Sequence, residues 1–322
     1  MSLEAGETTG RENVAAEVSD RVLENLARAV HAPRETLRLP LLALLAEGHA
    51  LIEDVPGVGK TVLAKALARS LDLEFHRLQF TPDLLPADVT GISVFDREGG
   101  TFAYRRGPVF GNVLLVDEIN RASPKTQSAL LEAMQENQVT VDGQTYPLER
   151  PFLVIATQNP VEFEGTYPLP EAQLDRFAVR FALGYPSPAD EARMLTEQTA
   201  DPPLDRLVPV VERSSLVAAI GATKETFVEE SINRYIVSLL QHTRDNARLV
   251  LGASPRAGIS LLRIAKARAA TERRDFVLPD DVQAVAAAVL GHRLLLAPEA
   301  TSAGVDVDEV IQEALSATPV PA

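Results

Sequence analysis

Asp54-Val55-Pro56-Gly57-Val58-Gly59-Lys60-Thr61 is the stretch of this sequence that decides the fold. A short apolar run at residues 50–52 precedes it, and a helical pattern follows from Lys60 to Leu71. Glycines lack a Cβ and let backbone N–H groups approach an anion, while the positive end of the helix dipole favours phosphate there. The order of strand, glycine loop and helix therefore predicts a phosphate-binding loop.

The side chains of this loop indicate what it would bind. Lys60 would reach the β- and γ-phosphates of ATP, and the Thr61 hydroxyl would hold Mg²⁺. Asp54 stands where the general motif has its first glycine, so its carboxylate must turn away from the phosphates. Taken alone, the stretch is also compatible with a strand, turn and helix in which the Gly-Lys pair is incidental.

A second signal is a pair of carboxylates directly after an apolar run. Residues 113–116 are all aliphatic and lead into Asp117 and Glu118. Ligands of open α/β sheets bind at the carboxyl ends of the strands, where these two residues would lie. We expect Asp117 to hold the Mg²⁺ shell and Glu118 to orient and deprotonate the attacking water.

Polar and cationic residues complete the set of candidates. Asn159 follows the apolar run 152–156 and could position the water or sense the γ-phosphate, although Asn-Pro is also a common turn. Arg176 precedes the last expected strand. Arg256 lies in the first turn of a helix capped by Ser254, where a cation opposes the helix dipole and calls for an anionic partner. Either arginine could instead form a surface salt bridge.

The remaining pattern predicts an α/β domain followed by an all-helical one. Strand-like runs alternate with helices up to residue 183, which favours a parallel sheet flanked by helices. Helical patterns fill 189–199, 214–220, 229–244, 255–271 and 279–290. We therefore predict a disordered tail at 1–18, the α/β domain at 19–186, the helical domain at 187–296 and a C-terminal tail at 297–322.

Two hairpins interrupt the alternation. Asp142-Gly143 is a strong two-residue turn between the short runs 139–141 and 144–146. A looser turn, residues 97–100, joins the runs 92–95 and 101–104. Both are additions beyond what a nucleotide site requires.

Composition excludes several classes of protein. The 322 residues include no Cys and only five scattered His, which argues against disulfides and a zinc site. The sequence shows neither a signal peptide nor an apolar run of about 18 residues, so we expect a cytoplasmic protein with no membrane span. The net charge of −14 argues against binding nucleic acid.

Together these motifs resemble the AAA+ ATPases and, more narrowly, the MoxR family, from about Asn25 to Leu296. The resemblance is carried by residues 53–61, 106–110, 117–122, 127–134, 157–160 and 169–177. Within this family an acid at position 54 is an accepted variant. Val30-His31-Ala32 departs from the family's usual Val-Gly pair near the adenine, which leaves the contacts to the base unassigned.

The resemblance implies a role for each candidate residue. Asp117 and Glu118 would form Walker B, Asn159 sensor 1, Arg176 the arginine finger and Arg256 the sensor 2 arginine of the helical lid. Thr61 and Asp117 would hold Mg²⁺. The nucleotide-binding residues of and around Walker A would be Pro56, Gly57, Val58, Gly59, Lys60, Thr61 and Val62.

The resemblance also implies partners and a biological class. Family members are proposed to act as chaperone-like ATPases on protein clients or metalloprotein complexes, in hexameric rings, often with von Willebrand A domain proteins. A metal-chelatase ATPase subunit has closely similar core motifs. A nucleic-acid translocase and a nucleotide-gated scaffold are further alternatives, which the acidic balance and the presence of Glu118, Asn159 and Arg176 respectively argue against.

Overall fold

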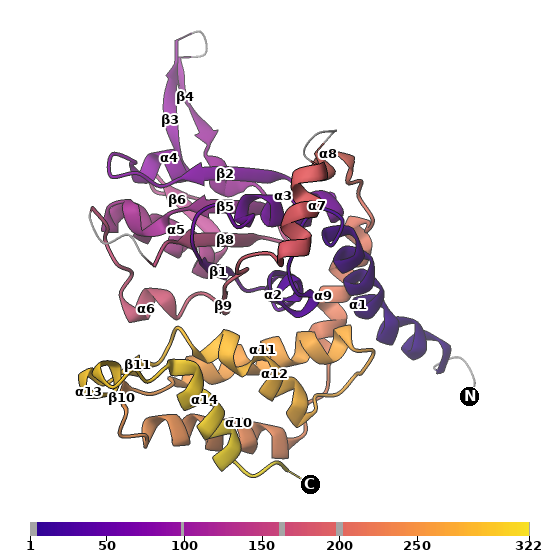
Figure 1. Ribbon diagram of the computed structural model, residues 1–322. Helices are drawn as coiled ribbons and strands as arrows, with labels where there is room; N and C mark the ends of the chain where they lie inside the picture. Colours follow the sequence, from indigo (N-terminus) through magenta and orange to yellow (C-terminus); the bar gives the residue numbers. More distant parts are fainter. Residues whose placement is uncertain (1–4, 98–99, 161–164, 198–201, 322) are drawn as a thin grey trace.

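The computed structural model describes residues 5–97, 100–160, 165–197 and 202–321. A five-stranded parallel sheet in the order β2-β5-β8-β1-β9 occupies the upper part of Figure 1, and a helical lid lies below it. The predicted α/β class with a helical lid is confirmed. The strands of the sheet are β1 Ala50–Glu53, β2 Phe75–Gln79, β5 Val113–Asp117, β8 Leu153–Gln158 and β9 Val179–Phe181.

The central strands are apolar throughout because both faces of the sheet are covered. Leu115 and Ile155 pack into one core with helices α1, α2 and α3, whereas Leu114 and Val154 pack with α5 on the opposite face. Alternation of side chains along each strand thus feeds two cores. The covering helices are α1 Ala5–Leu26, α2 Arg34–Leu45, α3 Lys60–Ser70 and α5 Pro124–Glu136.

Short elements connect the strands and helices at both edges of the sheet. The helix α4 packs against α5, and η2 lies beside β8 directly after the Walker B strand. The segment of α6 leads into β9 and carries Arg176 just beyond its end. These elements are α4 Pro86–Thr90, η1 Pro108–Phe110, η2 Ile119–Arg121 and α6 Glu171–Leu174.

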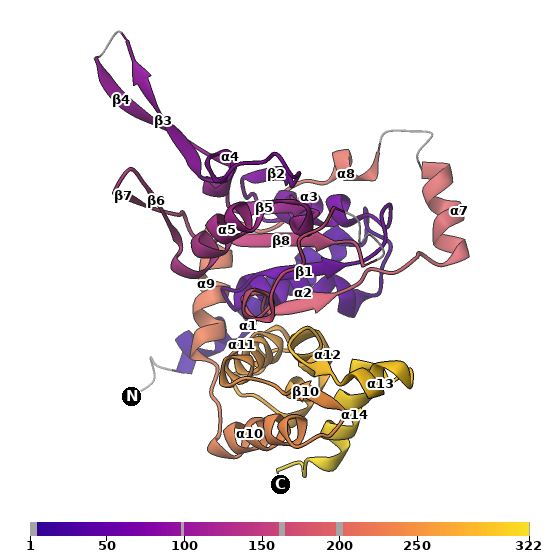
Figure 2. The same cartoon turned by 90° about the vertical axis from the view of Figure 1, so that its left-hand side faces the viewer.

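Both predicted hairpins are present and project from the same side of the α/β domain (Figure 2). One pairs β3 (Gly91–Asp96) with β4 (Thr101–Arg106), and the other pairs β6 (Gln138–Val141) with β7 (Gln144–Pro147). Asp142 and Gly143 have φ values of 50° and 76°, as a mirror-image two-residue turn requires. Glu98 and Gly99 of the other predicted turn lie outside the described residues.

The lid is helical, with one short antiparallel pair of strands. Its helices α10, α11 and α12 match the predicted patterns closely, and α11 packs against α1 and α2 of the α/β domain. The elements are α10 Glu230–Arg244, β10 Leu249–Leu251, α11 Pro255–Thr271, α12 Pro279–Leu290, β11 Leu295–Leu296, α13 Pro298–Ser302 and α14 Val307–Ala317.

The predicted boundary near residue 186 is misplaced. Helix α9 (Arg213–Glu225) packs along α1 and so belongs with the α/β domain, while α7 (Pro188–Glu197) stands away from the body and α8 (Pro203–Arg206) lies near α3. Proline-rich composition at 185–188 marked a change of direction in the chain. The lid begins after α9, at about Thr226.

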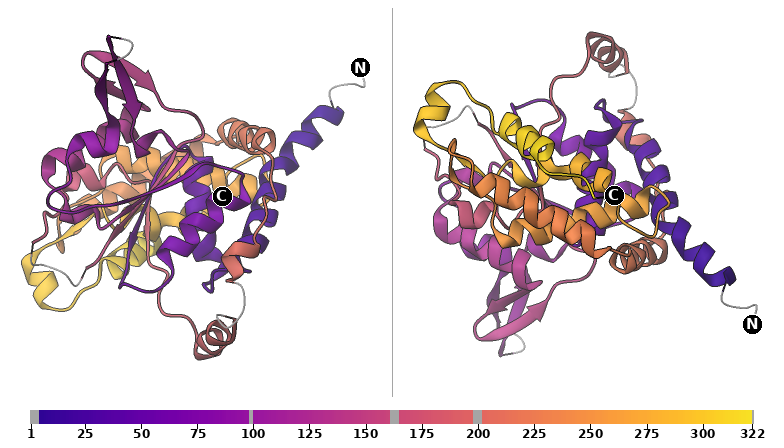
Figure 3. Two further views of the ribbon diagram at one scale, coloured as in Figure 1. Left: turned by 90° about the horizontal axis from the view of Figure 1, so that it is seen from above. Right: turned by 90° about the horizontal axis from the view of Figure 1, so that it is seen from below.

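Both predicted tails are largely structured. Helix α1 begins at Ala5, not after residue 18, and Ala15, Ala16 and Val18 are buried, although the first turns extend beyond the body (Figure 3). In α14, Val310 and Ile311 are fully buried against the lid. The sequence did not predict these helices because small and polar residues predominate in them, and only one face of each helix is apolar. Among the described residues no helix is long and apolar enough to cross a bilayer.

Candidate functional site

The phosphate-binding loop joins the end of β1 to the start of α3. Gly57 and Gly59 have φ values of +91° and +96°, a region that side chains with a Cβ rarely adopt, and a Cβ there would meet no other atom. Glycine is therefore favoured at both positions by the backbone conformation and not by a lack of space for a side chain. The loop turns its backbone into the N-terminus of α3, where Lys60 and Thr61 begin the helix.

Asp54 turns away from the loop, as the sequence requires. One carboxylate oxygen accepts the N–H of Val55 at 2.8 Å, and the other accepts the N–H groups of Leu183 and Gly184, each at 2.8 Å. Three charge-assisted hydrogen bonds satisfy this buried carboxylate. Asp54 therefore ties the loop to the chain that leaves β9, a role that a glycine could not take.

Lys60 lies among acidic groups. Its Nζ donates to the Asp54 carbonyl oxygen at 2.5 Å. Burial lowers the pKa of the Lys60 ammonium, and the charges of Asp54, Asp117 and Glu118 oppose that shift. The ammonium is thus held at the mouth of the loop, where an entering phosphate would replace the carbonyl as its partner.

The Walker B aspartate stands at the carboxyl edge of the sheet and is held from two sides. Arg77 Nε on β2 lies 2.7 Å from Asp117 Oδ2, and the Thr157 hydroxyl on β8 donates to Oδ1 at 3.3 Å. The strand order β2-β5-β8 places both partners next to Asp117. Neither Arg77 nor Thr157 was predicted, although the alternation of polar residues along 75–79 could have indicated Arg77 and Gln79.

Glu118 occupies an unusual backbone position. Its φ of 58° and ψ of 52° are left-handed, a conformation that costs a non-glycine residue about 1 kcal/mol. The Thr157 hydroxyl fixes it by accepting its N–H at 3.0 Å, and Arg121 Nε lies 2.9 Å from Glu118 Oε2. Such outliers occur where surrounding structure imposes them. Here Glu118 lines the same cavity as Asp117.

Most of the predicted residues meet in one cavity of about 350 Å³. Asn159, directly after β8, lines it together with the loop and the two acids. Val58 does not line this cavity. It packs instead against the core that the sheet forms with α1, α2 and α3. The lining residues are Pro56, Gly57, Gly59, Lys60, Thr61, Val62, Arg77, Gln79, Asp117, Glu118, Thr157 and Asn159.

The oxygen donors in this cavity suit Mg²⁺. Magnesium prefers hard oxygen ligands and keeps several waters, so that one or two protein oxygens and the substrate's phosphates complete its shell. The Thr61 hydroxyl and the Asp117 carboxylate offer such oxygens on the same cavity. The described residues contain no group of three or more His, Cys, Asp or Glu that could hold a metal ion.

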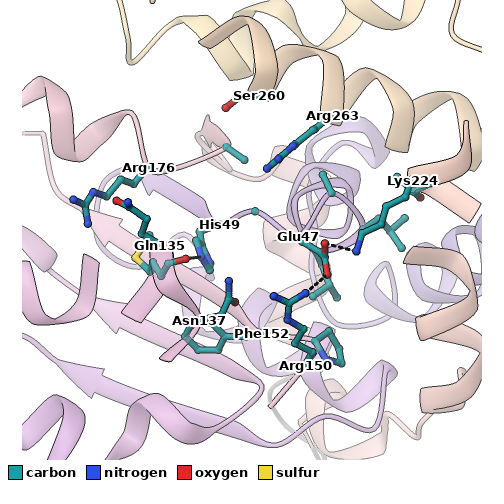
Figure 4. A pocket seen from close by; sticks show the side chains of 18 of the residues that line it. Glu47, His49, Gln135, Asn137, Arg150, Phe152, Arg176, Lys224, Ser260 and Arg263 are labelled. Carbon is teal, nitrogen blue, oxygen red and sulfur yellow. Dashed lines mark hydrogen bonds and ion pairs between the residues drawn. The ribbon is translucent and has the colours of Figure 1, made fainter. Parts of the chain in front are cut away.

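The two predicted arginines lie elsewhere, on a second cavity of about 510 Å³ between the α/β domain and the lid (Figure 4). None of its lining residues lines the first cavity. Figure 4 shows Arg263 reaching from α11 towards the α/β domain, and Arg150 and Lys224 both pairing with Glu47. The lining is cationic in an acidic chain: its cations are Arg150, Arg176, Lys224, Arg256, Arg263 and Lys266, and its acids are Glu47 and Asp175.

Arg176 is only partly satisfied. Its NH1 donates to the Leu131 carbonyl oxygen at 2.6 Å. Its buried Nε has no hydrogen-bond acceptor among the described residues. The guanidinium therefore keeps one buried donor without a partner in the described part of the chain, while the side chain lines the second cavity.

Arg256 has an acidic partner, but only a distant one. Ser254 caps α11 as predicted, accepting the N–H of Ala257 at 3.1 Å. Arg256 Nε lies 4.0 Å from Asp175 Oδ2, and half of the side chain is exposed. Within this chain the anionic partner expected for Arg256 is therefore Asp175, which is next to Arg176. A nucleotide in the loop of the same chain would lie in the other cavity.

Comparison with known proteins agrees with this architecture. Residues 49–179 match the model of the ATPase family associated with various cellular activities (AAA), and residues 241–314 match the AAA lid domain. A crystal structure of a protein from Cytophaga hutchinsonii superposes with a TM-score of 0.92 at 37% identity, covering 100% of both chains. The lid match begins inside α10 and includes most of α14, in keeping with the corrected boundaries.

Relatives of full length narrow the assignment. YeaC of Bacillus subtilis, described as uncharacterized, is 49% identical over 301 residues, which cover 94% of each chain. The chaperone MoxR1 of Mycobacterium tuberculosis is 39% identical over 97% of this chain and 85% of its own. The protein MoxR of Methylorubrum extorquens is 33% identical over 86% and 88%. With the glycine loop, the Asp117–Glu118 pair and the lid in place, this chain belongs to the MoxR family of AAA+ ATPases.

Proposed function

We propose that this protein hydrolyses ATP in a Mg²⁺-dependent reaction, at sites that two copies of the chain share within a closed, hexameric ring. The observation that supports sharing is the separation of the two cavities. Lys60, Glu118 and Asn159 line one of them, whereas Arg176 and Arg256 line the other. Arginines on a separate cationic cavity are available to the nucleotide of a neighbouring subunit.

Within one subunit, each residue of the first cavity has a distinct task. Lys60 binds the β- and γ-phosphates, while the N–H groups of Gly57 and Gly59 face them from the loop. Glu118 accepts the proton of the attacking water, and the Asn159 amide orients that water. Thr61 and Asp117 would hold Mg²⁺, which when bound neutralises charge on the phosphate oxygens.

Across the subunit boundary, Arg176 and Arg256 stabilise the charge that spreads over the γ-phosphate oxygens in the transition state. An arginine supplied in trans to such a site is worth about 10³- to 10⁵-fold in rate. The Arg176 guanidinium lines the second cavity and would provide the donors for this contact. Neither arginine is needed for a subunit to bind ATP in its own loop.

Mixing two inactive variants tests the shared site. Arg176→Ala and Lys60→Ala rings should each hydrolyse ATP at no more than about one hundredth of the wild-type rate, because each lacks one half of every site. In mixed rings, some interfaces pair the intact loop of the Arg176→Ala chain with the intact arginine of the Lys60→Ala chain. Phosphate release should therefore recover in part.

Native mass spectrometry of the mixed rings is the control, because it shows that subunits have exchanged. A mixture of Arg176→Ala with Arg256→Ala is matched to it, since both chains are defective on the same side and should stay inactive. Exchange without recovered hydrolysis would contradict sharing through Arg176.

We further propose that hydrolysis drives chaperone-like remodelling or activation of protein clients or metalloprotein complexes in the cytoplasm, with a von Willebrand A domain protein as a partner. One relative is itself named a chaperone. The β3–β4 hairpin supports a protein client, since Phe95 and Phe102 stack edge to face with centroids 5.2 Å apart and are 52% and 72% exposed. Exposed aromatic pairs of this kind favour contact with other proteins.

Polar substitution of the hairpin should separate client action from ATP binding. In a Phe95→Ser/Phe102→Ser variant we expect ATP affinity within about twofold of wild type, since the hairpin lies outside the nucleotide cavity, and about a tenfold loss of client binding, from the loss of two aromatic contacts. Affinity capture from cell extract, quantified against wild type, measures the loss.

Val237→Ser, which removes a comparably exposed apolar side chain from the lid helix α10, is the matched control. Undiminished capture by the hairpin variant would contradict its role in binding clients, and loss of ATP binding would mark the hairpin as structural. Three relatives that match most of the chain and carry a functional name are MoxR proteins. We therefore propose neither a chelatase subunit nor a nucleic-acid translocase.

A further inference from the structure

Arg293, in the turn between α12 and β11 of the lid, is buried at the boundary with the α/β domain. It is 6% exposed, and its side chain reaches the segment between α6 and β9. Its Nε lies 2.6 Å from Asp175 Oδ1, and its NH2 donates to the carbonyl oxygens of Phe177 at 2.7 Å and Asp175 at 3.2 Å. A lid arginine thus holds both residues that flank Arg176.

Neighbouring contacts extend this clamp. Arg293 NH1 donates to the Ala178 carbonyl oxygen at 3.4 Å, and NH2 also donates to the Ser260 hydroxyl of α11 at 3.2 Å. His292 Nε2 lies 2.9 Å from the Phe177 carbonyl oxygen, so a second side chain of the same turn binds the same segment. Asp175 carries the clamp on to Arg256, since its other oxygen faces that guanidinium at 4.0 Å.

Stability alone is a weak reason for this arrangement. Burial lowers the pKa of Arg293, and the hydrogen bond and charge of Asp175 oppose the shift. Removing a guanidinium from water costs several kcal/mol, and an ion pair that replaces its hydration commonly does no better than an apolar side chain would. The planar guanidinium of Arg293 instead fixes positions. Its donors hold three backbone carbonyl groups and one carboxylate on both sides of the arginine finger.

We propose that Arg293 is a positioning residue that holds Arg176 and Arg256 in one fixed arrangement for the neighbouring subunit's nucleotide. The inference rests on the proposed sharing of sites between subunits. Arg293 touches no part of the phosphate-binding cavity, so its action passes through the segment 175–178 and through Asp175. Movement of the lid and of the finger is therefore coupled, because one side chain ties both.

Arg293→Met removes the fork and keeps an unbranched apolar stem. We expect kcat for ATP hydrolysis to fall about 10- to 100-fold, the effect of displacing a positioned group by about 1 Å. The affinity of each subunit for ATP should stay within about twofold, because the loop and the Walker B acids are untouched. Phosphate release and binding of a fluorescent ATP analogue measure the two quantities.

Complementation shows on which side of the site the defect lies. Arg293→Met mixed with Lys60→Ala should recover activity, because the Lys60→Ala chain supplies an intact finger and clamp to an intact loop. Arg293→Met mixed with Arg176→Ala should not recover, since both chains fail on the finger side. A variant that had merely lost its structure would complement neither partner.

Two further variants show whether a fall in kcat comes only from the loss of a buried charge in the lid or from misfolding. Arg274→Met is the matched control, because Arg274 forms a two-pronged ion pair with the buried Asp281 elsewhere in the lid and should leave kcat unchanged in folded rings. Arg293→Lys keeps the charge beside Asp175 without the fork, so it should fold where Arg293→Met does not, with an intermediate kcat.

The outcomes separate this inference from the proposed function. Recovery by Arg176→Ala with Lys60→Ala, but not by Arg293→Met with Lys60→Ala, would overturn only the role of Arg293. Wild-type kcat in Arg293→Met or Arg293→Lys would overturn it as well. Failure of the Arg176→Ala mixture after proven exchange would instead contradict the shared site itself.

Discussion

Glu118→Gln should bind ATP with nearly wild-type affinity and hydrolyse it about 10²- to 10⁴-fold more slowly. The carboxamide keeps the shape of the side chain but cannot accept a proton from water. The backbone should not move, because the Glu118 N–H is held by the Thr157 hydroxyl at 3.0 Å and η2 follows directly. Phosphate release at saturating ATP, together with titration of a fluorescent ATP analogue, measures both quantities.

A surface substitution provides the control for this result. Glu230→Gln changes the same functional group on the exposed face of α10, where Glu230 pairs with Arg234, and should leave turnover unchanged. Turnover near the wild-type rate in Glu118→Gln would show that another group handles the water. If the variant behaves as expected, it would hold the proposed ring in an ATP-bound state, and proteins that co-purify with it from cell extract would be the clients that we propose.

Lys60→Ala should lose nucleotide binding. Truncating one partner of a desolvated charge pair costs about 2–5 kcal/mol, which corresponds to a loss of affinity of about 30- to 5,000-fold. Three carboxylates, those of Asp54, Asp117 and Glu118, interact with the Lys60 ammonium. Without that ammonium they repel the phosphates, so the loss should lie towards the upper end of the range.

Calorimetric titration with ATP and Mg²⁺ measures the affinity of the variant. Lys65→Ala is the matched control, because Lys65 lies on the same helix α3 with its Nζ 6.0 Å from the Phe75 ring and away from the cavity. Thermal unfolding of both variants establishes that the chains are folded. ATP affinity within a few-fold of wild type in folded Lys60→Ala would remove the phosphate-binding assignment of the loop.

Local patterns in the sequence predicted the core of the α/β domain. The glycine loop, the strand before Asp117 and Glu118, and the helices 124–136, 255–271 and 279–290 all appear where predicted. Each of these features depends on backbone conformation or on periodicity within a few turns, such as the left-handed glycines of the loop. Neighbouring residues alone contain that information.

The predictions that were wrong or missing concern features that depend on contacts between residues far apart in the sequence. The boundary near residue 186 was misplaced because α9 finds its partner in α1, almost 200 residues earlier in the chain. The tails were assigned as disordered because their apolar faces are narrow, and burial depends on the helices that receive them. Arg77 escaped notice because its partner Asp117 becomes a neighbour only through the pairing of β2 with β5.

The sequence by itself thus determined that this chain has a glycine loop between a strand and a helix, a pair of carboxylates after an apolar strand, and a helical lid. Only the tertiary structure decided that Arg176 and Arg256 leave that site, and that Arg293 reaches Asp175 across 118 residues of sequence. The physical reason is the range of the forces involved. Backbone preferences act between adjacent residues, whereas the partner of a charged side chain is chosen by how whole helices and strands pack.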